Sequence, residues 1–112
     1  MLDSGATAVF CCNDLMALGF SKRAEERGLS IPQDISLIGY DNVLNSLGIA
    51  SDLTTIDQDI PRLAQSCHAY MMRRIKQNSS ESSRTPWLSD PKTSLLEPKM
   101  IINGSVKTIH QN

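Results

Sequence analysis

Two apolar runs in the first half of the chain end abruptly at polar side chains. Thr7–Cys12 reads TAVFCC and is followed by Asn-Asp, while Ile35–Gly39 reads ISLIG and is followed, after one tyrosine, by Asp-Asn. Neither run alternates strictly between apolar and polar residues, a pattern typical of short strands buried on both faces. The pattern therefore predicts two buried strands, each with amide and carboxylate groups just beyond its carboxyl end.

The segment between these strands has the signals of a helix. Leu15–Arg27 is preceded by Asn13 and Asp14, either of which suits an N-cap, and Gly28 stands just past the predicted end. A strand, a helix and a second strand in this order form a β-α-β unit, whose crossover favours parallel pairing of the two strands.

A second helix is predicted in the other half of the chain. Asp59 and Pro61 are good start signals, and the helix is expected to continue to Gln77 with basic residues near its end. Its apolar residues recur at i, i+4 spacing: Leu63, Cys67, Met71 and Ile75. This spacing predicts one apolar face.

The remaining segments have weaker patterns. Residues 40–52 are expected to form an irregular loop, Leu53–Ile56 a short extended piece, and Met100–Ile102 a last strand. From Asn78 to about Pro91 the chain is rich in Ser and Pro, with almost no apolar residues apart from Trp87 and Leu88, which predicts a flexible surface loop.

Composition narrows the functional classes. The chain has 112 residues, 40% of them hydrophobic and 21% charged, with a formal net charge of −1. This charge argues against a free-standing nucleic-acid binder, and no apolar run reaches the length that spans a membrane. The three cysteines, Cys11, Cys12 and Cys67, lack metal-ligand spacing, and we expect buried, reduced thiols in a cytoplasmic protein.

The polar residues after the two strands suggest a ligand site. Carboxyl ends of neighbouring parallel strands meet at one edge of a sheet, where α/β proteins bind ligands. A carboxylate accepts hydrogen bonds, whereas a carboxamide both donates and accepts, so together they suit a polyol, a sugar or the edge of a heterocycle. The alternative is that Asn13 or Asp14 only caps the helix and Asp41 only shapes its turn, and both interpretations remain open at this point.

Four blocks carry a resemblance to a known family. In order, they are AVFCCNDLMALGF, GLSIPQDISLIGYDN, LTTIDQD and PKMIINGSV. Together they resemble the C-terminal part of the lac repressor/gal repressor (LacI/GalR) family of transcriptional regulators. The resemblance implies an α/β fold with a three-layer parallel sheet of the periplasmic-binding-protein-like type, present only as the C-terminal part of a two-lobed effector domain. It also implies that a small carbohydrate effector binds between the lobes.

The resemblance also implies how the chain is divided. The whole of 1–112 would be a C-terminal fragment of the effector-binding domain, with 1–52 as the β-α-β portion of the second lobe. Residues 53–77 would be a crossing segment and a first-lobe helix, 78–97 the flexible loop, and 98–112 the return strand and tail.

The resemblance also implies which residues of this chain occupy the effector-binding positions of the family. Asn13 and Asp41 match effector-binding positions of the family, and Gln58 and Ile60 match positions that approach the ligand near the hinge. Asp14 ranks lower, since it more often supports the turn. Ile60 is aliphatic where some members have an aromatic ring, which weakens any stacking contact with a sugar.

Partners are implied in the same way. Surfaces used for homodimerisation in the family match Leu18, Leu44, Leu47 and Ile49, although packing against their own sheet is the alternative for these residues. Operator DNA would be contacted only through an N-terminal helix-turn-helix headpiece. Asn103 stands where the family usually has Arg, which puts the usual role of that position at the hinge in doubt.

Two other classes remain as alternatives. A periplasmic sugar-binding protein of a transporter would share the lobes and the polar groups, although the GLSIPQDISLIGYDN block is nearer the repressor pattern. A small flavodoxin-like or Rossmann-type enzyme would need a nucleophile with its base or a glycine-rich phosphate loop, and the sequence contains neither. We therefore predict a binding domain with no catalytic residues, no metal site and no cofactor.

Overall fold

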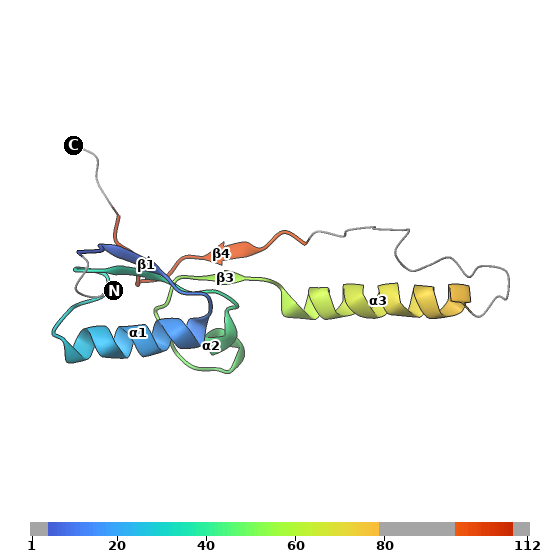
Figure 1. Ribbon diagram of the computed structural model, residues 1–112, viewed down its shortest axis with the longest axis horizontal. Helices are drawn as coiled ribbons and strands as arrows, with labels where there is room; N and C mark the ends of the chain where they lie inside the picture. The colour runs from blue at the N-terminus through green and yellow to red at the C-terminus, as the bar shows by residue number, and fades with distance from the viewer. Residues whose placement is uncertain (1–4, 79–95, 109–112) are drawn as a thin grey trace. The chain divides into compact units, whose positions relative to one another are not determined.

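The computed structural model describes residues 5–78 and 96–108, in two compact units. The first unit joins residues up to 57 with those from 98 onward, and the second begins at residue 58. The first contains β1 (Ala8–Phe10), α1 (Asp14–Glu26), β2 (Ser36–Ile38), α2 (Val43–Ser46), β3 (Thr55–Asp57) and β4 (Lys99–Ile101), and the second contains α3 (Ile60–Asn78) (Figure 1). Most of the predicted loop, 79–95, lies outside the described residues.

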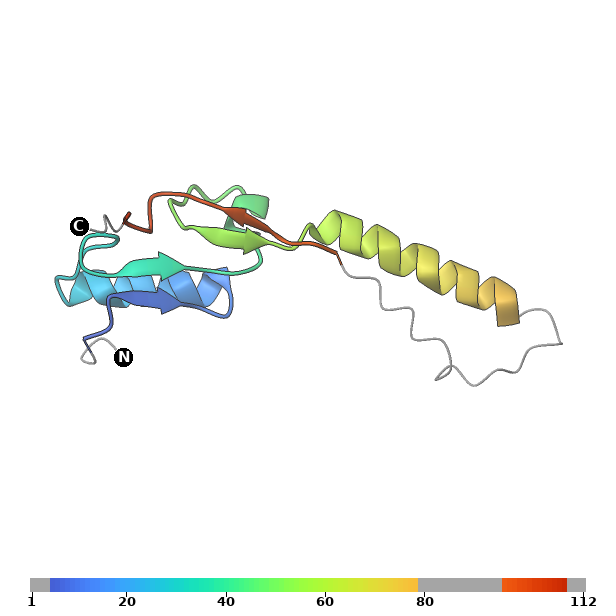
Figure 2. The same ribbon diagram turned by 90° about the horizontal axis from the view of Figure 1, so that it is seen from above.

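The predicted β-α-β unit is confirmed. β1 and β2 pair in parallel, with Ala8 opposite Ser36 and Phe10 opposite Ile38. α1 connects them and lies along one face of the pair (Figure 2). Both strands have three residues and are shorter than the apolar runs that predicted them.

α1 begins and ends by local chemistry. The side-chain oxygen of Asn13 accepts a hydrogen bond from the Met16 backbone N–H at 2.8 Å, so Asn13 rather than Asp14 is the N-cap. At the other end Gly28 has φ +73°, and its N–H and that of Leu29 bond back to carbonyls of the last turn. This left-handed ending satisfies carbonyls that the helix itself leaves without partners.

The core lies between α1 and the strands. Leu37 of β2 is 1% exposed and packs with Cys11, Leu44 and Leu53. Ala17 of α1 is fully buried in the same cluster, and a small residue at this position lets the helix approach the sheet closely. Phe10 alternates to the opposite face and is 58% exposed. Within the described part of this unit, helix therefore covers only one face of the pair, and the second helical layer of the predicted three-layer arrangement is not among these residues.

Two crossing segments extend the sheet. β3 and β4 pair antiparallel, Ile56 opposite Met100, and a parallel bridge between Ile38 and Thr54 connects this ladder to β2. Buried hydroxyls reinforce the connection. The Thr54 hydroxyl exchanges hydrogen bonds with the backbone of Asn103, and the Ser105 hydroxyl donates to the Leu37 carbonyl at 2.5 Å. The return segment is thus bonded to both the crossing segment and the core strand.

α3 starts where predicted, and most of its side chains from Ile60 to Lys76 are exposed. The Asp59 carboxylate accepts from the Arg62 N–H at 3.3 Å, and the Asp59 carbonyl accepts from Leu63. The side chains of the predicted apolar face are uncovered, Met71 being 57% and Ile75 55% exposed.

Two predictions are wrong in detail. Residues 43–46 form the short helix α2 inside the segment expected to be an irregular loop. Of the three cysteines expected to be buried, only Cys11 is, because Cys12 alternates out of the strand and Cys67 lies on the uncovered α3.

Candidate functional site

The carboxyl ends of β1 and β2 lie together, as the sequence predicts. The backbone N–H of Asp14 donates to the Tyr40 carbonyl at 2.9 Å, which joins the start of α1, shortly after β1, to the segment that follows β2. The rings of Phe10 and Tyr40 meet edge to face with their centroids 6.4 Å apart. The two polar pairs that end the apolar runs are therefore neighbours at one edge of the sheet.

Asn13 has a structural task at this edge. It is half-buried, and its side-chain oxygen is the acceptor of the α1 cap. Capping uses only the oxygen, so the carboxamide nitrogen keeps its donor chemistry. One Asn13 side chain can therefore cap α1 and still donate a hydrogen bond to a ligand.

The Asp14 carboxylate is buried and hydrogen-bonded within the first unit. Its side chain is 1% exposed, one carboxylate oxygen accepts from the Thr55 hydroxyl at 2.5 Å, and the other accepts from the Val43 N–H at 2.7 Å. A buried carboxylate needs partners of this kind to offset its lost hydration. Both carboxylate oxygens of Asp14 therefore have hydrogen-bond donors within the first unit.

Asp41 occupies an unusual backbone conformation. It has φ +97°, and Asn42 beside it has φ +53°. The Asp41 N–H donates to the Ile56 carbonyl at 2.9 Å, so β3 holds this turn from the side. Two consecutive left-handed residues turn the chain sharply out of β2 and directly into α2.

Gln58 and Ile60 belong to the second unit and follow β3 in the chain. Gln58 is half-buried, whereas Ile60 is 51% exposed at the start of α3.

The four predicted dimer residues do not share one environment. Leu44 is 3% exposed and belongs to the core cluster, so packing within its own unit accounts for it and leaves little of its surface for a partner. Leu18, Leu47 and Ile49 are 48%, 64% and 45% exposed.

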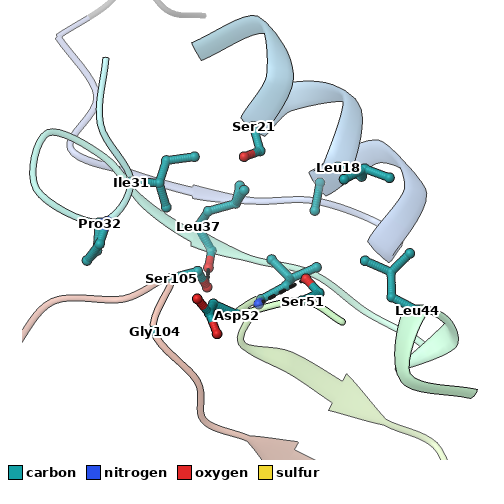
Figure 3. A pocket seen from close by; sticks show the side chains of 12 residues that line it. Leu18, Ser21, Ile31, Pro32, Leu37, Leu44, Ser51, Asp52, Gly104 and Ser105 are labelled. Atoms are coloured by element: carbon teal, nitrogen blue, oxygen red, sulfur yellow. Dashed lines mark hydrogen bonds between the residues drawn. The ribbon is translucent and has the colours of Figure 1, made fainter. Parts of the chain in front are cut away.

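Two cavities open beside these elements, and sequence reasoning gave no sign of either. One, of about 300 Å³, lies between α1 and the segments around Ile31, Asp52 and Ser105, with Leu37 at its floor (Figure 3). The other, of about 400 Å³, is bordered by Asn42, Thr55 and the loop after α2. Their walls come from segments far apart in sequence, which no local pattern brings together.

Other chemistry is sparse in the described part of the chain. Burial, with a smaller contribution from the neighbouring Cys12, raises the pKa of the Cys11 thiol above its ordinary value, so this thiol stays protonated and weakly reactive. Residues 5–78 and 96–108 hold no group of three or more side chains suited to a metal ion. Nor does that part contain a helix both long and apolar enough for a membrane span.

Comparisons with known proteins agree with this architecture. Residues 2–99 match the family model of the periplasmic binding protein-like domain. The HTH-type transcriptional repressor PurR of Glaesserella parasuis is 40% identical over 109 residues, covering 97% of this chain and 31% of the repressor. The chain therefore spans about a third of the length of this relative.

Solved structures of LacI family regulators also match this chain. A LacI family transcriptional regulator from Enterococcus faecalis with bound ribose matches 97% of this chain and 38% of its own, with a TM-score of 0.78 and 30% identity. The lac repressor dimer bound to operator and the anti-inducer ONPF matches 91% of this chain and 32% of its own, with a TM-score of 0.65 and 30% identity.

The homologues are transcriptional repressors and not enzymes, which confirms the prediction of a chain without catalytic function. The α/β fold of the predicted type is likewise confirmed. The chain belongs to the periplasmic-binding-protein-like domain family, in the form found in the LacI/GalR regulators.

Proposed function

We propose that this chain is the effector-binding and dimerisation part of a LacI-type transcriptional regulator, and that its effector is a small sugar or sugar-like molecule. The observation that carries the proposal is that the segments carrying Asn13 and Asp41 are hydrogen-bonded to each other at the carboxyl edge of the parallel strands, where α/β proteins bind ligands. The ribose bound in the Enterococcus faecalis relative supports the choice of ligand class.

The chemistry of the two residues suits hydroxyl groups. The Asp41 carboxylate accepts hydrogen bonds from sugar hydroxyls, and the Asn13 carboxamide nitrogen donates to a hydroxyl oxygen while its own oxygen caps α1. Gln58 and Ile60 are proposed as further effector contacts, one polar and one apolar. Asp14 acts from behind the site, through the turn that it supports.

The proposed dimer surface is formed by Leu18, Leu47 and Ile49. All three are large apolar side chains with about half of their surface exposed or more, and two of them lie on the loop that follows α2. Exposure of several large apolar side chains is a common feature of surfaces that bind another protein. The lac repressor match is a dimer, which supports a second copy of the chain as the partner.

Regulation would follow from a population shift. An effector that binds one arrangement of the regulator better than another favours that arrangement, and the dimer then presents its headpieces differently to operator half-sites. In this proposal the protein is cytoplasmic, and a separate helix-turn-helix headpiece contacts the DNA. The 112 residues themselves carry a net charge of −1, which does not favour binding to a phosphate backbone.

A sugar titration tests the site. The ¹⁵N-labelled chain is titrated with D-ribose and a panel of other pentoses and hexoses, and amide shifts are followed. We expect at least one sugar to shift the signals of Asn13, Asp41 and Gln58, with a Kd of about 1 mM or below, equivalent to about −4 kcal/mol.

The matched variant is Asp41→Ala. Loss of a charge-assisted hydrogen bond costs about 1.5–3 kcal/mol, or roughly ten- to a hundredfold in affinity, which moves a millimolar interaction out of range. A panel in which every sugar leaves these signals unmoved would overturn the sugar proposal, as would an Asp41→Ala chain that binds as tightly as the original.

A further inference from the structure

A group of buried hydrogen bonds surrounds the strained turn at Asp41. Four consecutive residues, 40–43, each have a backbone or side-chain bond to a residue distant in sequence. The Tyr40 carbonyl accepts from the Asp14 N–H, the Asp41 N–H donates to the Ile56 carbonyl, and the Val43 N–H donates to the Asp14 carboxylate. A left-handed aspartate persists only where its surroundings hold it, and these bonds provide that restraint.

Thr55 lies at the centre of this group. Its hydroxyl donates to one Asp14 carboxylate oxygen at 2.5 Å and accepts from the Asn42 N–H at 3.4 Å. Thr55 and Asp14 are 3% and 1% exposed, so water does not compete for either bond. One hydroxyl therefore connects the start of α1, the start of β3 and the turn after β2.

Two further features help to hold the turn at Asp41 and Asn42 in place. The Asn42 carboxamide donates to the Asp57 carboxylate at 3.1 Å, which ties the second left-handed residue to the end of β3. A side-chain carbon at Gly39 would collide with the Asp14 carboxylate and would come within 2.8 Å of Leu53, so glycine is what lets Asp14 approach the turn.

We propose that Asp14, Asn42 and Thr55 form a clamp that holds the backbone of Asp41 in its left-handed conformation, which makes Thr55 and Asn42 positioning residues for the effector site. The clamp also joins the site to the proposed dimer surface. α2 starts at Val43, whose N–H is held by Asp14, and Leu47 and Ile49 follow α2 directly. The inference rests on the proposed function only in assigning Asp41 to effector binding. The hydrogen bonds of the clamp are present without any ligand.

The chain offers a matched pair of threonines for a test. Thr54 is buried to the same degree as Thr55 and its hydroxyl also makes two hydrogen bonds, but to Asn103 rather than to the turn. Thr55→Val and Thr54→Val remove one hydroxyl each at nearly constant shape. The measurement is amide hydrogen exchange and HN–Hα coupling at residues 41–43 of the ¹⁵N-labelled chain, together with the melting temperature.

We expect Thr55→Val to speed exchange at Asn42 by roughly tenfold or more and to shift the Asp41 signals, as loss of a hydrogen bond to a charged group predicts. Thr55→Ser, which keeps the hydroxyl, should restore them. Thr54→Val should instead affect Asn103 and leave 41–43 unchanged. An unchanged turn in Thr55→Val, equal effects of the two valine variants, or no rescue by serine would each overturn the clamp.

A second variant covers the case in which Thr55→Val does not fold. Asn42→Gly removes the bond to Asp57 while suiting the positive φ of this position, and it should speed exchange at Asp41 and Val43. Unchanged exchange there would overturn the clamp. D-ribose titration of the same variants separates the two proposals. If no sugar binds the original chain while the exchange results hold, the sugar assignment fails and the clamp stands.

Discussion

At the scale of single residues, Asn13 combines a helix cap with a proposed ligand contact. The cap uses the side-chain oxygen, which accepts from the Met16 N–H, and the proposed contact uses the carboxamide nitrogen. Substitutions that remove one role and keep the other therefore separate the two. Serine keeps a capping oxygen and lacks the amide donor, whereas alanine lacks both.

We predict that Asn13→Ala lowers the free energy of unfolding by about 1 kcal/mol, the usual cost of a lost N-cap, while Asn13→Ser stays within a few tenths of the original. Both variants should weaken sugar binding. Urea unfolding followed by circular dichroism gives the stability, and the sugar titration gives the affinity. If Asn13→Ser bound sugar as well as the original chain, Asn13 would be a cap and nothing more.

The role of Asp14 shows what local sequence cannot reveal. Its position before a helix predicts either a cap or a ligand, and the structure shows instead a buried acceptor whose donors lie 29 and 41 residues away. Thr54 and Thr55 are equivalent in the sequence LTT, yet their hydroxyls serve different segments. Long-range bonds of this kind depend on the finished fold, so no spacing rule predicts them.

At the scale of elements, two glycines in and just beyond α1 have opposite expected behaviour. Gly19 lies inside the helix, and Gly28 lies just past its end with φ +73°. A side-chain carbon added at either position meets nothing within 4 Å, so packing contributes to neither substitution. The change in the free energy of unfolding should therefore depend only on the backbone preference of the new residue.

We predict that Gly19→Ala raises the free energy of unfolding by about 0.5–1 kcal/mol, because glycine weakens a helix interior. Gly28→Ala should lower it by about 1–2 kcal/mol, because an L side chain disfavours the left-handed region. Thermal unfolding of the two variants beside the original chain tests both signs. Destabilisation by Gly19→Ala would contradict the first prediction, and a Gly28→Ala chain as stable as the original would mean that α1 does not end as described.

Elements with strong local signals are the ones that the sequence predicts. α1 and α3 have caps and periodic apolar residues, and the β1–β2 pair follows from the β-α-β order. α2 has only four residues and lacks a side-chain cap bond, so nothing in VLNS distinguishes it from a loop. It forms because the turn before it is held by Asp14 and because Leu44 packs into the core. Tertiary contacts thus create this helix.

At the scale of the whole molecule, two apolar surfaces of the described chain are uncovered. The first is the proposed dimer surface of Leu18, Leu47 and Ile49, in the first unit. The second is the face of α3 that includes Leu63, Met71 and Ile75, which are 39%, 57% and 55% exposed. Burial of apolar area in water is favourable at about 25 cal/mol per Å², so both surfaces favour association.

We predict that the 112-residue chain is at least a dimer at micromolar concentration, measured by multi-angle light scattering. Charged substitutions identify the surface that carries the contact. Leu47→Glu should shift the population toward monomer if the proposed dimer surface is used, while Met71→Glu provides the matched change on α3. The reverse result would assign association to the α3 face and remove the support for the dimer surface. A well-folded monomer of the original chain would contradict the prediction for both surfaces, since it would mean that neither one buries enough apolar area to offset the entropy lost on pairing.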